Sequence, residues 1–128
     1  MKRAAIALAG AASLAACKSD ETVTGYGGAG LWQLETPVNG AAPLSLALTP
    51  DGRLTATGPC NTLIAAQTAP YPWFRLTQIA VTERACPALK AETDTFTALR
   101  SASLVEVAQG TLILSNENGL EMVFRAAP

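Results

Sequence analysis

Two cysteines in the middle of the chain constrain its fold more than any other feature. Cys60 lies in Gly58-Pro59-Cys60-Asn61 and Cys86 lies in Ala85-Cys86-Pro87, with 25 residues between them. The intervening pattern predicts a strand, a turn and another strand, and a helix is predicted after Cys86. A bond between the two cysteines would therefore tie the middle of a sheet to the start of that helix.

The first residues predict an export signal. Lys2 and Arg3 form a short positive stretch, and an apolar run follows over residues 4–16. A helix needs about 20 apolar residues to cross a bilayer, and this run is shorter. It therefore predicts a signal peptide over residues 1–16.

The apolar run ends in Leu14-Ala15-Ala16-Cys17, which resembles the lipobox of bacterial lipoproteins. The resemblance implies that Cys17 receives a diacylglyceryl group and becomes the first residue after cleavage. A simple signal peptide with a coincidental cysteine is the alternative. A lipid anchor of two or more acyl chains would hold the protein to a membrane. Lys18 follows Cys17. By the same resemblance, the lack of aspartate at this position implies the outer membrane, with the protein facing the periplasm.

Residues 17–29 predict a flexible tether, because four glycines stand between residues 25 and 30 and glycine disfavours both helix and packed strand. Tyr26 has no evident role there. Residues 30–128 then predict one small domain with a modest core.

Composition excludes several classes of function. The net charge is −1, and it falls to −3 without residues 1–16, which carry Lys2, Arg3 and no acid. Nucleic acid is excluded as a partner because no cluster of basic residues could neutralise phosphates. The chain has no histidine, which removes the usual general base and the commonest metal ligand. Neither a metal nor a cofactor is expected.

Alternating apolar residues predict mostly strands. Residues 44–49 and 53–58 flank Pro50-Asp51-Gly52, a strong turn signal, and so predict a hairpin. Further strands are predicted at residues 31–35, 62–67, 73–81, 104–107, 111–115 and 120–125.

Pro87 suits the first turn of a helix, where its missing N–H is not needed. Leu89, Phe96 and Leu99 then recur at helical spacing and predict a helix over residues 88–101 with these three side chains on its buried stripe. The expected fold class is mainly β (α+β): a small antiparallel barrel or curved sheet of about eight strands, with one helix after the second body cysteine.

The order of motifs over residues 30–126 resembles the META domain, also called the HslJ-like domain. The residues that carry the resemblance are Trp32 in Trp-x-Leu, Gly58, Cys60 and Asn61 in Gly-x-Cys-Asn, and Thr82, Cys86 and Pro87 in Thr-x-x-x-Cys-Pro. The sequence departs from the family pattern at Pro59, where a small or polar residue is common, and at Arg84, near which methionine is common.

The resemblance implies a cracked β-barrel similar to secretin pilot lipoproteins. It also implies an envelope or secreted protein, often a lipoprotein, without an established catalytic reaction. Some members of the family are linked to stress or antibiotic tolerance and others to motility.

Cys60 and Cys86 form an even pair in an oxidising compartment once Cys17 is lipidated, so a disulfide is expected. Closing a loop of this size would stabilise the fold by roughly 3–4 kcal/mol in the chain-entropy model. A redox pair is the alternative, but catalytic dithiols usually stand as Cys-x-x-Cys. Two thiols and no histidine are too few ligands for zinc.

The chain is not expected to be an enzyme, since triads that need histidine are impossible. Glu83, Glu92, Asp94 and Glu106 could supply paired carboxylates, but each is expected to be a solvated charge. Asn61 is expected to cap its turn, with ligand contact as the alternative.

Tyr71, Trp73 and Phe74 form the most distinctive patch. They either fill the mouth of the barrel or mark an exposed binding surface. Two functions follow as hypotheses. The first is a non-enzymatic envelope lipoprotein that binds another envelope protein, as an assembly or stress-protection module. The second is a carrier that holds an acyl chain or small apolar ligand inside the barrel.

Overall fold

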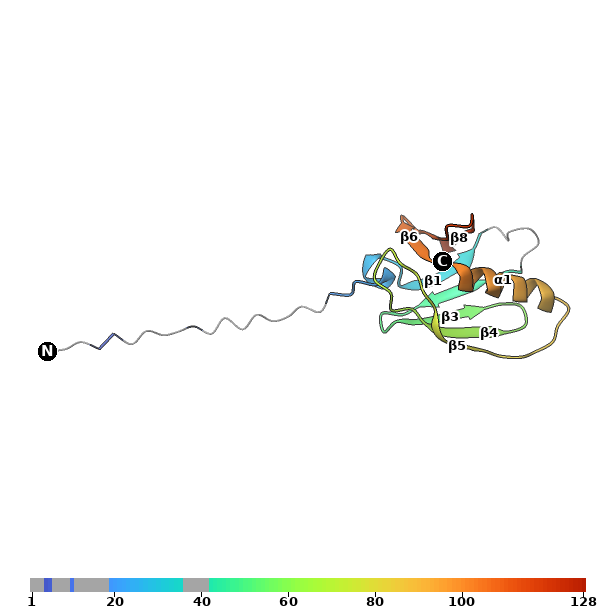
Figure 1. Cartoon of the computed structure of the whole chain (residues 1–128), viewed down its shortest axis with the longest axis horizontal. Helices are drawn as coiled ribbons and strands as arrows, with labels where there is room; N and C mark the ends of the chain where they lie inside the picture. Colours follow the sequence, from blue (N-terminus) through green and yellow to red (C-terminus); the bar gives the residue numbers. More distant parts are fainter. Residues whose placement is uncertain (1–3, 6–9, 11–18, 36–41) are drawn as a thin grey trace.

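The chain folds into one curled antiparallel sheet with a helix across its open side (Figure 1). The computed structural model describes residues 4–5, 10, 19–35 and 42–128. Cys17 and most of the predicted signal peptide lie outside the described residues. In chain order the elements are η1 (Val23–Tyr26), β1 (Gly30–Leu34), β2 (Ser45–Leu48), β3 (Arg53–Thr57), β4 (Thr62–Ala66), β5 (Thr77–Val81), α1 (Leu89–Ser101), β6 (Leu104–Ala108), β7 (Thr111–Ser115) and β8 (Glu121–Ala126).

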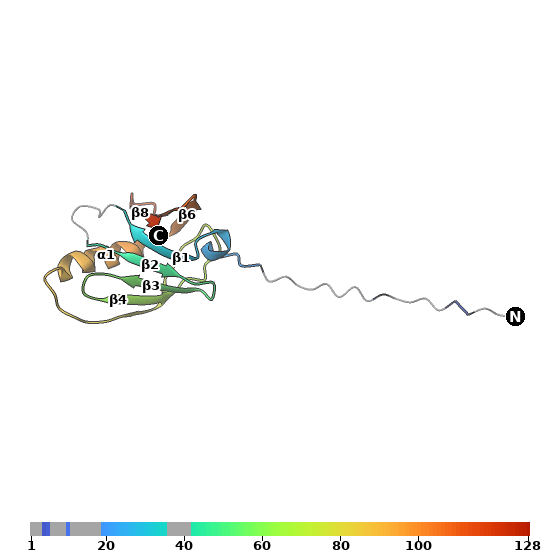
Figure 2. The ribbon, with the colours of Figure 1, turned by 180° about the vertical axis from the view of Figure 1, so that it is seen from behind.

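The eight strands run in the order β5-β4-β3-β2-β1-β8-β7-β6, and every neighbouring pair is antiparallel. The curl brings the two end strands toward one another, which gives a half-barrel rather than a closed one (Figures 1 and 2). The prediction of a mainly β fold of about eight strands, with a helix after the second body cysteine, is confirmed for the described residues.

Alternation in the strands places one set of side chains inside the curl. In β2 and β3, Leu46, Leu48, Leu54 and Ala56 are buried, while the residues between them are at least partly exposed. Gly52 closes the hairpin with a φ of +85°, a conformation that favours glycine. The core is filled from both halves of the sheet by Trp32, Leu44, Leu46, Leu48, Leu54, Ala56, Leu63, Ala65, Phe74, Phe96, Leu99, Val105, Leu112, Leu114, Met122 and Phe124.

The strand predicted at residues 73–81 is wrong over its first part, because β5 begins only at Thr77. The preceding segment crosses to the other end of the sheet instead. Phe74 N–H donates to the Ser103 carbonyl at 2.9 Å, and Val105 N–H donates to the Pro72 carbonyl at 2.8 Å. These bonds place residues 72–74 against the edge of β6 and narrow the opening of the half-barrel.

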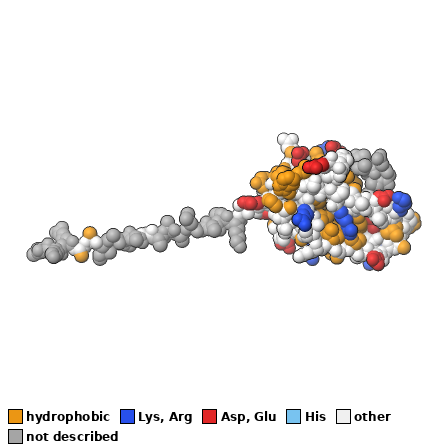
Figure 3. All heavy atoms as spheres, in the orientation of Figure 1, with side chains coloured by type: hydrophobic (Ala, Val, Ile, Leu, Met, Phe, Trp, Pro, Cys, Tyr) orange, Lys and Arg blue, Asp and Glu red, His pale blue; other side chains and the backbone are white. Residues whose placement is uncertain are grey.

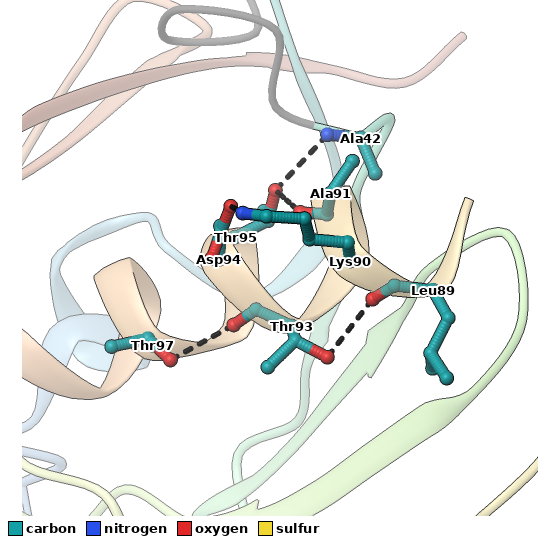
Figure 4. A network of polar contacts seen from close by, with 8 residues as sticks. All are labelled: Ala42, Leu89, Lys90, Ala91, Thr93, Asp94, Thr95 and Thr97. Atoms are coloured by element: carbon teal, nitrogen blue, oxygen red, sulfur yellow. Dashed lines mark hydrogen bonds and ion pairs between the residues drawn. The ribbon is translucent and has the colours of Figure 1, made fainter.

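The helix α1 agrees with the predicted range within a residue, and it buries Phe96 and Leu99. Leu89, predicted on the same stripe, is exposed. It stands at the first helical position, where the helix reaches past the end of the sheet. Figure 4 shows how Thr95 fastens the middle of α1: its hydroxyl accepts from Ala42 N–H at 3.1 Å and donates to the Ala91 carbonyl at 2.9 Å. In the described part of the chain, no helix is long and apolar enough to cross a membrane.

Residues 17–29 were expected to be a flexible tether, and that prediction is wrong for the folded part of this range. Val23–Tyr26 form a 3₁₀ helix, and Val23 is fully buried. Gly28 N–H donates to the Val23 carbonyl at 2.9 Å, and the Trp32 indole N–H donates to the Gly28 carbonyl at 2.9 Å. The buried Val23 side chain anchors this glycine-rich segment to the hydrophobic core.

Shortening Val23 should therefore destabilise the whole domain. We expect Val23→Ala to lower the free energy of unfolding by about 2 kcal/mol, because it leaves a cavity in the core. Denaturant unfolding followed by circular dichroism would measure the change.

The control is Leu31→Ala in neighbouring β1, which removes more apolar atoms from an exposed side chain. Its cost should stay within about 0.5 kcal/mol. Equal costs for the two variants would show that Val23 does not belong to the cooperative core.

Candidate functional site

The carboxylate of Glu92 is the centre of the polar network between α1 and the β3–β4 turn. Its Oε2 accepts from Cys60 N–H at 2.6 Å and from Asn61 N–H at 2.8 Å. Its Oε1 accepts from Asn61 Nδ2 at 2.8 Å. Glu92 is only 1% exposed. The helix thus holds the turn through a buried, fully hydrogen-bonded charge.

Asn61 extends this network to the segment between β5 and α1. Its Oδ1 accepts from Arg84 N–H at 2.6 Å and from the Thr82 hydroxyl at 3.0 Å, and its Nδ2 also donates to the Arg84 carbonyl at 3.0 Å. The expected role in stabilising a turn was too narrow. The buried side chain joins three segments. Hydrogen bonds to protein partners occupy both its Oδ1 and its Nδ2.

Cys60 and Cys86 form the expected disulfide, with their Cα atoms 5.8 Å apart. The bond joins the β3–β4 turn to the residues just before α1. Pro87 follows at the turn into the helix, and Leu89 N–H donates to the Cys86 carbonyl at 3.0 Å. The covalent bond and the Glu92 network therefore fasten the same turn to the same helix; we call them together the clasp.

Gly58 leaves the space that the Glu92 carboxyl group occupies. A Cβ atom at this position would stand 2.5 Å from Glu92 Oε2 and 2.9 Å from its Cγ. Ordinary contacts are longer, and the carboxylate is held in place by its three hydrogen bonds. Gly58 is therefore required by close approach of a side chain rather than by backbone conformation.

Two opposing effects act on the pKa of Glu92. Burial raises it, while the hydrogen bonds from Asn61 and Cys60 lower it, and the hydrogen bonds together prevail. The pKa of Glu92 therefore lies below its ordinary value, and the group remains a carboxylate in the folded protein at neutral pH.

The expectation that Glu92 is a solvated charge is wrong. A signal was present in the sequence, since Glu92 stands four residues before Phe96 and so shares the face of α1 that packs on the core. Asp94, by contrast, is exposed and pairs with Lys90 at 3.0 Å (Figure 4). Glu83 and Glu106 are exposed as well.

The aromatic patch predicted at residues 71–74 divides into two parts. Phe74 is buried in the core, and Tyr71 is half-buried, its hydroxyl accepting from Val107 N–H at 3.2 Å. Trp73 is 58% exposed. Phe74 therefore belongs to the core and Tyr71 packs against it, while Trp73 faces outward. Trp32, the other tryptophan, belongs to the core.

A cleft of about 470 Å³ lies beside the clasp, between α1 and the segment that leads into it. Phe96, Leu89 and Val81 give it apolar walls. Arg84 and Arg100 supply exposed positive charge, Glu83 supplies one exposed negative charge, and Glu92 is buried at the wall. The remaining lining residues are Asn61, Thr82, Ala85, Thr93 and Thr97. An apolar floor beside two guanidinium groups suits a ligand or peptide segment that is part apolar and part acidic.

The geometry agrees with the family to which the chain belongs. The META domain family model matches residues 28–128, so the chain is a member of the META domain family. In this member Trp32, Gly58, Asn61, Thr82 and Pro87 serve the core and the clasp. No curated protein matches the chain.

Two solved structures share the fold. A protein from Burkholderia xenovorans, solved by NMR, aligns with a TM-score of 0.61 at 17% identity, over 85% of this chain and 83% of its own. A DUF4847 family protein from Bacteroides vulgatus aligns with a TM-score of 0.52 at 14% identity, over 65% of this chain. The chain spans 57% of the length of that second protein. At these identities the likeness concerns the fold alone.

Glu92 should make stability depend on pH in a defined direction. Because its pKa is lower in the folded than in the unfolded state, its contribution is fully present above the ordinary value of 4.5 and is lost as pH falls through the folded value. We expect Glu92→Gln to lower the free energy of unfolding by about 2–3 kcal/mol at pH 7, because its amide cannot accept all three hydrogen bonds.

The same variant should flatten the fall of stability between pH 5 and acid, measured by denaturant unfolding at each pH. Asp94→Asn is the control, and it should change the profile little because its ion pair is exposed. An unchanged acid profile in Glu92→Gln would contradict the assignment.

Gly58→Ala should destabilise the fold by about 1–3 kcal/mol through overpacking against Glu92. A double-mutant cycle tests the cause, because the cost should largely disappear in a Glu92→Ala background where the carboxyl group is gone. A cost that is the same in both backgrounds would place the clash elsewhere.

Proposed function

We propose that this protein is a non-enzymatic, lipid-anchored protein of the cell envelope whose META domain binds another envelope protein. The lipid would be carried by Cys17 in the outer membrane, with the domain in the periplasm. The observation that carries the proposal is the cleft beside the clasp, whose disulfide and Glu92 network hold the adjoining turn and helix together.

The chemistry of the cleft supports binding rather than catalysis. The Glu92 carboxylate accepts three hydrogen bonds from the protein itself, so it is not available as an acid or a base. Asn61 is likewise engaged. The remaining ionisable residues of the cleft, Glu83, Arg84 and Arg100, are exposed.

The position of the cleft also favours a partner that approaches from the periplasm. The N-terminal segment joins the domain at the end where η1 lies, and the first turn of α1 lies at the opposite end (Figures 1 and 2). A domain anchored through its N-terminus would therefore present the cleft away from the bilayer. The partner segment would offer an apolar side chain to Phe96 and a carboxylate to Arg84 or Arg100.

A small amphipathic ligand is the second candidate, because the volume of the cleft lies in the range of about 300–1,000 Å³ that is usual for ligand sites. The carrier hypothesis placed such a ligand inside the barrel. The interior is filled by core side chains, so the ligand would lie beside α1 instead. Native mass spectrometry of protein purified from the envelope would detect it as an added mass.

Site-specific photocrosslinking in the envelope tests the protein-binding proposal. A photoreactive residue replaces Leu89 at the rim of the cleft, and a second protein carries it at Glu117 in the β7–β8 turn as the control. We expect an adduct from position 89 alone, joined to a segment of the partner that combines apolar and acidic residues.

Arg84→Glu with Arg100→Glu should reduce that adduct at least several-fold, because the reversed charge repels the acidic partner. Equal capture from positions 89 and 117, or capture unaffected by charge reversal, would overturn the proposal. A free acyl chain captured at position 89 would favour the second candidate.

A further inference from the structure

Three aromatic side chains form a surface where the N-terminal segment joins the domain. Tyr26 of η1 stacks on Tyr71 with ring centroids 4.4 Å apart and an angle of 13° between the planes. Trp73 follows two residues later. Tyr26 is 56% exposed and Trp73 is 58% exposed. We call Tyr26, Tyr71 and Trp73 the aromatic surface; Figure 3 shows hydrophobic side chains gathered over this end of the molecule.

The exposed ring of Trp73 is not required to hold its own segment in place. The backbone does this: Trp73 N–H donates to the Pro70 carbonyl at 2.8 Å, and residues 73 and 104 form an antiparallel bridge. The buried Gln67 adds a hydrogen bond from Arg75 N–H to its Oε1 at 2.8 Å. The fold thus fixes the position of the Trp73 indole ring while leaving it exposed to solvent.

The N-terminal segment is attached directly to this surface. The Glu21 carbonyl accepts from Tyr71 N–H at 2.8 Å, and Thr22 forms an antiparallel bridge with Pro70. Asp20 accepts from Thr22 N–H at 2.9 Å and from the hydroxyls of Thr22 and Thr24. The folded part of the chain therefore begins at Asp20, three residues after Cys17.

This distance decides what the aromatic surface can reach. The Cα atoms of Cys17 and Glu21 are four residue steps apart in the chain, which spans at most about 14 Å even when fully extended. The polar interface of a bilayer adds about 5–8 Å on each side of its hydrocarbon core. A lipid on Cys17 would therefore bring the aromatic surface to the level of the headgroups.

We propose that the aromatic surface of Tyr26, Tyr71 and Trp73 inserts into the interface of the bilayer that holds Cys17. Tryptophan and tyrosine are the side chains that favour this zone, where the ring is partly buried and its polar edge stays wet. The proposal rests on lipidation of Cys17 and adds a second point of attachment that sets the orientation of the domain.

Nearby charge specifies the kind of lipid. Asp20 and Glu21 are exposed on the N-terminal segment at the aromatic surface, where they outnumber Arg75, which is exposed two residues after Trp73. Negative side chains are repelled by anionic headgroups over about a Debye length. The surface therefore suits zwitterionic headgroups, and contact should weaken as the fraction of anionic lipid rises at low salt.

Quenching of tryptophan fluorescence by brominated acyl chains tests the proposal. The lipidated protein that begins at Cys17 is placed in vesicles of phosphatidylcholine, either plain or brominated. We expect brominated lipid to reduce the emission of the native protein. Trp73→Phe should abolish the reduction, since it leaves only the buried Trp32. A matched control combines Trp73→Phe with Lys90→Trp, which moves the indole to a side chain that is 89% exposed at the other end of the molecule.

The outcomes separate this proposal from the one it rests on. Lipidated native protein that is quenched, with Lys90→Trp unquenched, supports insertion. Lipidated protein that floats with the vesicles but is not quenched overturns it, and equal quenching at both positions overturns it as well. If Cys17 carries no lipid by mass and the protein does not float, the anchor proposal itself fails.

Discussion

The buried carboxylate of Glu92 holds together parts of the chain that lie far apart in sequence. It accepts two backbone N–H groups of the β3–β4 turn and one side-chain N–H of Asn61, while Asn61 in turn fixes the segment that leads into α1. A buried charge is costly unless such bonds are complete. The network is complete here, so the position of the helix on the half-barrel is specified as well as stabilised.

The most distinctive residues of the sequence therefore serve architecture. Cys60 and Cys86 form the disulfide of the clasp, and Asn61 and Thr82 belong to its hydrogen-bond network. Gly58 leaves room for the Glu92 carboxyl group. Two features remain exposed at the ends of the domain: the cleft next to the clasp, and the aromatic surface where the N-terminal segment joins. The proposed functions use these ends and leave the clasp intact.

The fold was predictable from the sequence to a large extent because its signals are local. Alternation placed the leucines of β2 and β3, an Asp-Gly turn joined them, and Pro87 marked the approach to α1. The even cysteine pair predicted the disulfide. These inferences rest on residues close together in the sequence or, for the disulfide, on the number of cysteines.

The errors share a physical cause, which is that long-range contacts decided them. Glu92 is buried because donors 31 and 32 residues away converge on it. The glycine-rich segment around Val23 folds because the core accepts that one side chain, and residues 73 and 74 of the predicted strand lie against the β6 edge instead. Contacts between residues so far apart in the sequence cannot be predicted from local composition.

Because residues 20–28 are folded, no long spacer would separate the bilayer from the domain in the lipidated form. The distance of the cleft from the bilayer would then equal the size of the domain itself, about 35 Å for a compact body of this length. The protein could then bind partners only in a thin layer next to its membrane. A partner would have to be resident in that layer or extend into it, and mechanical load between the two would pass through the Thr22–Pro70 bridge.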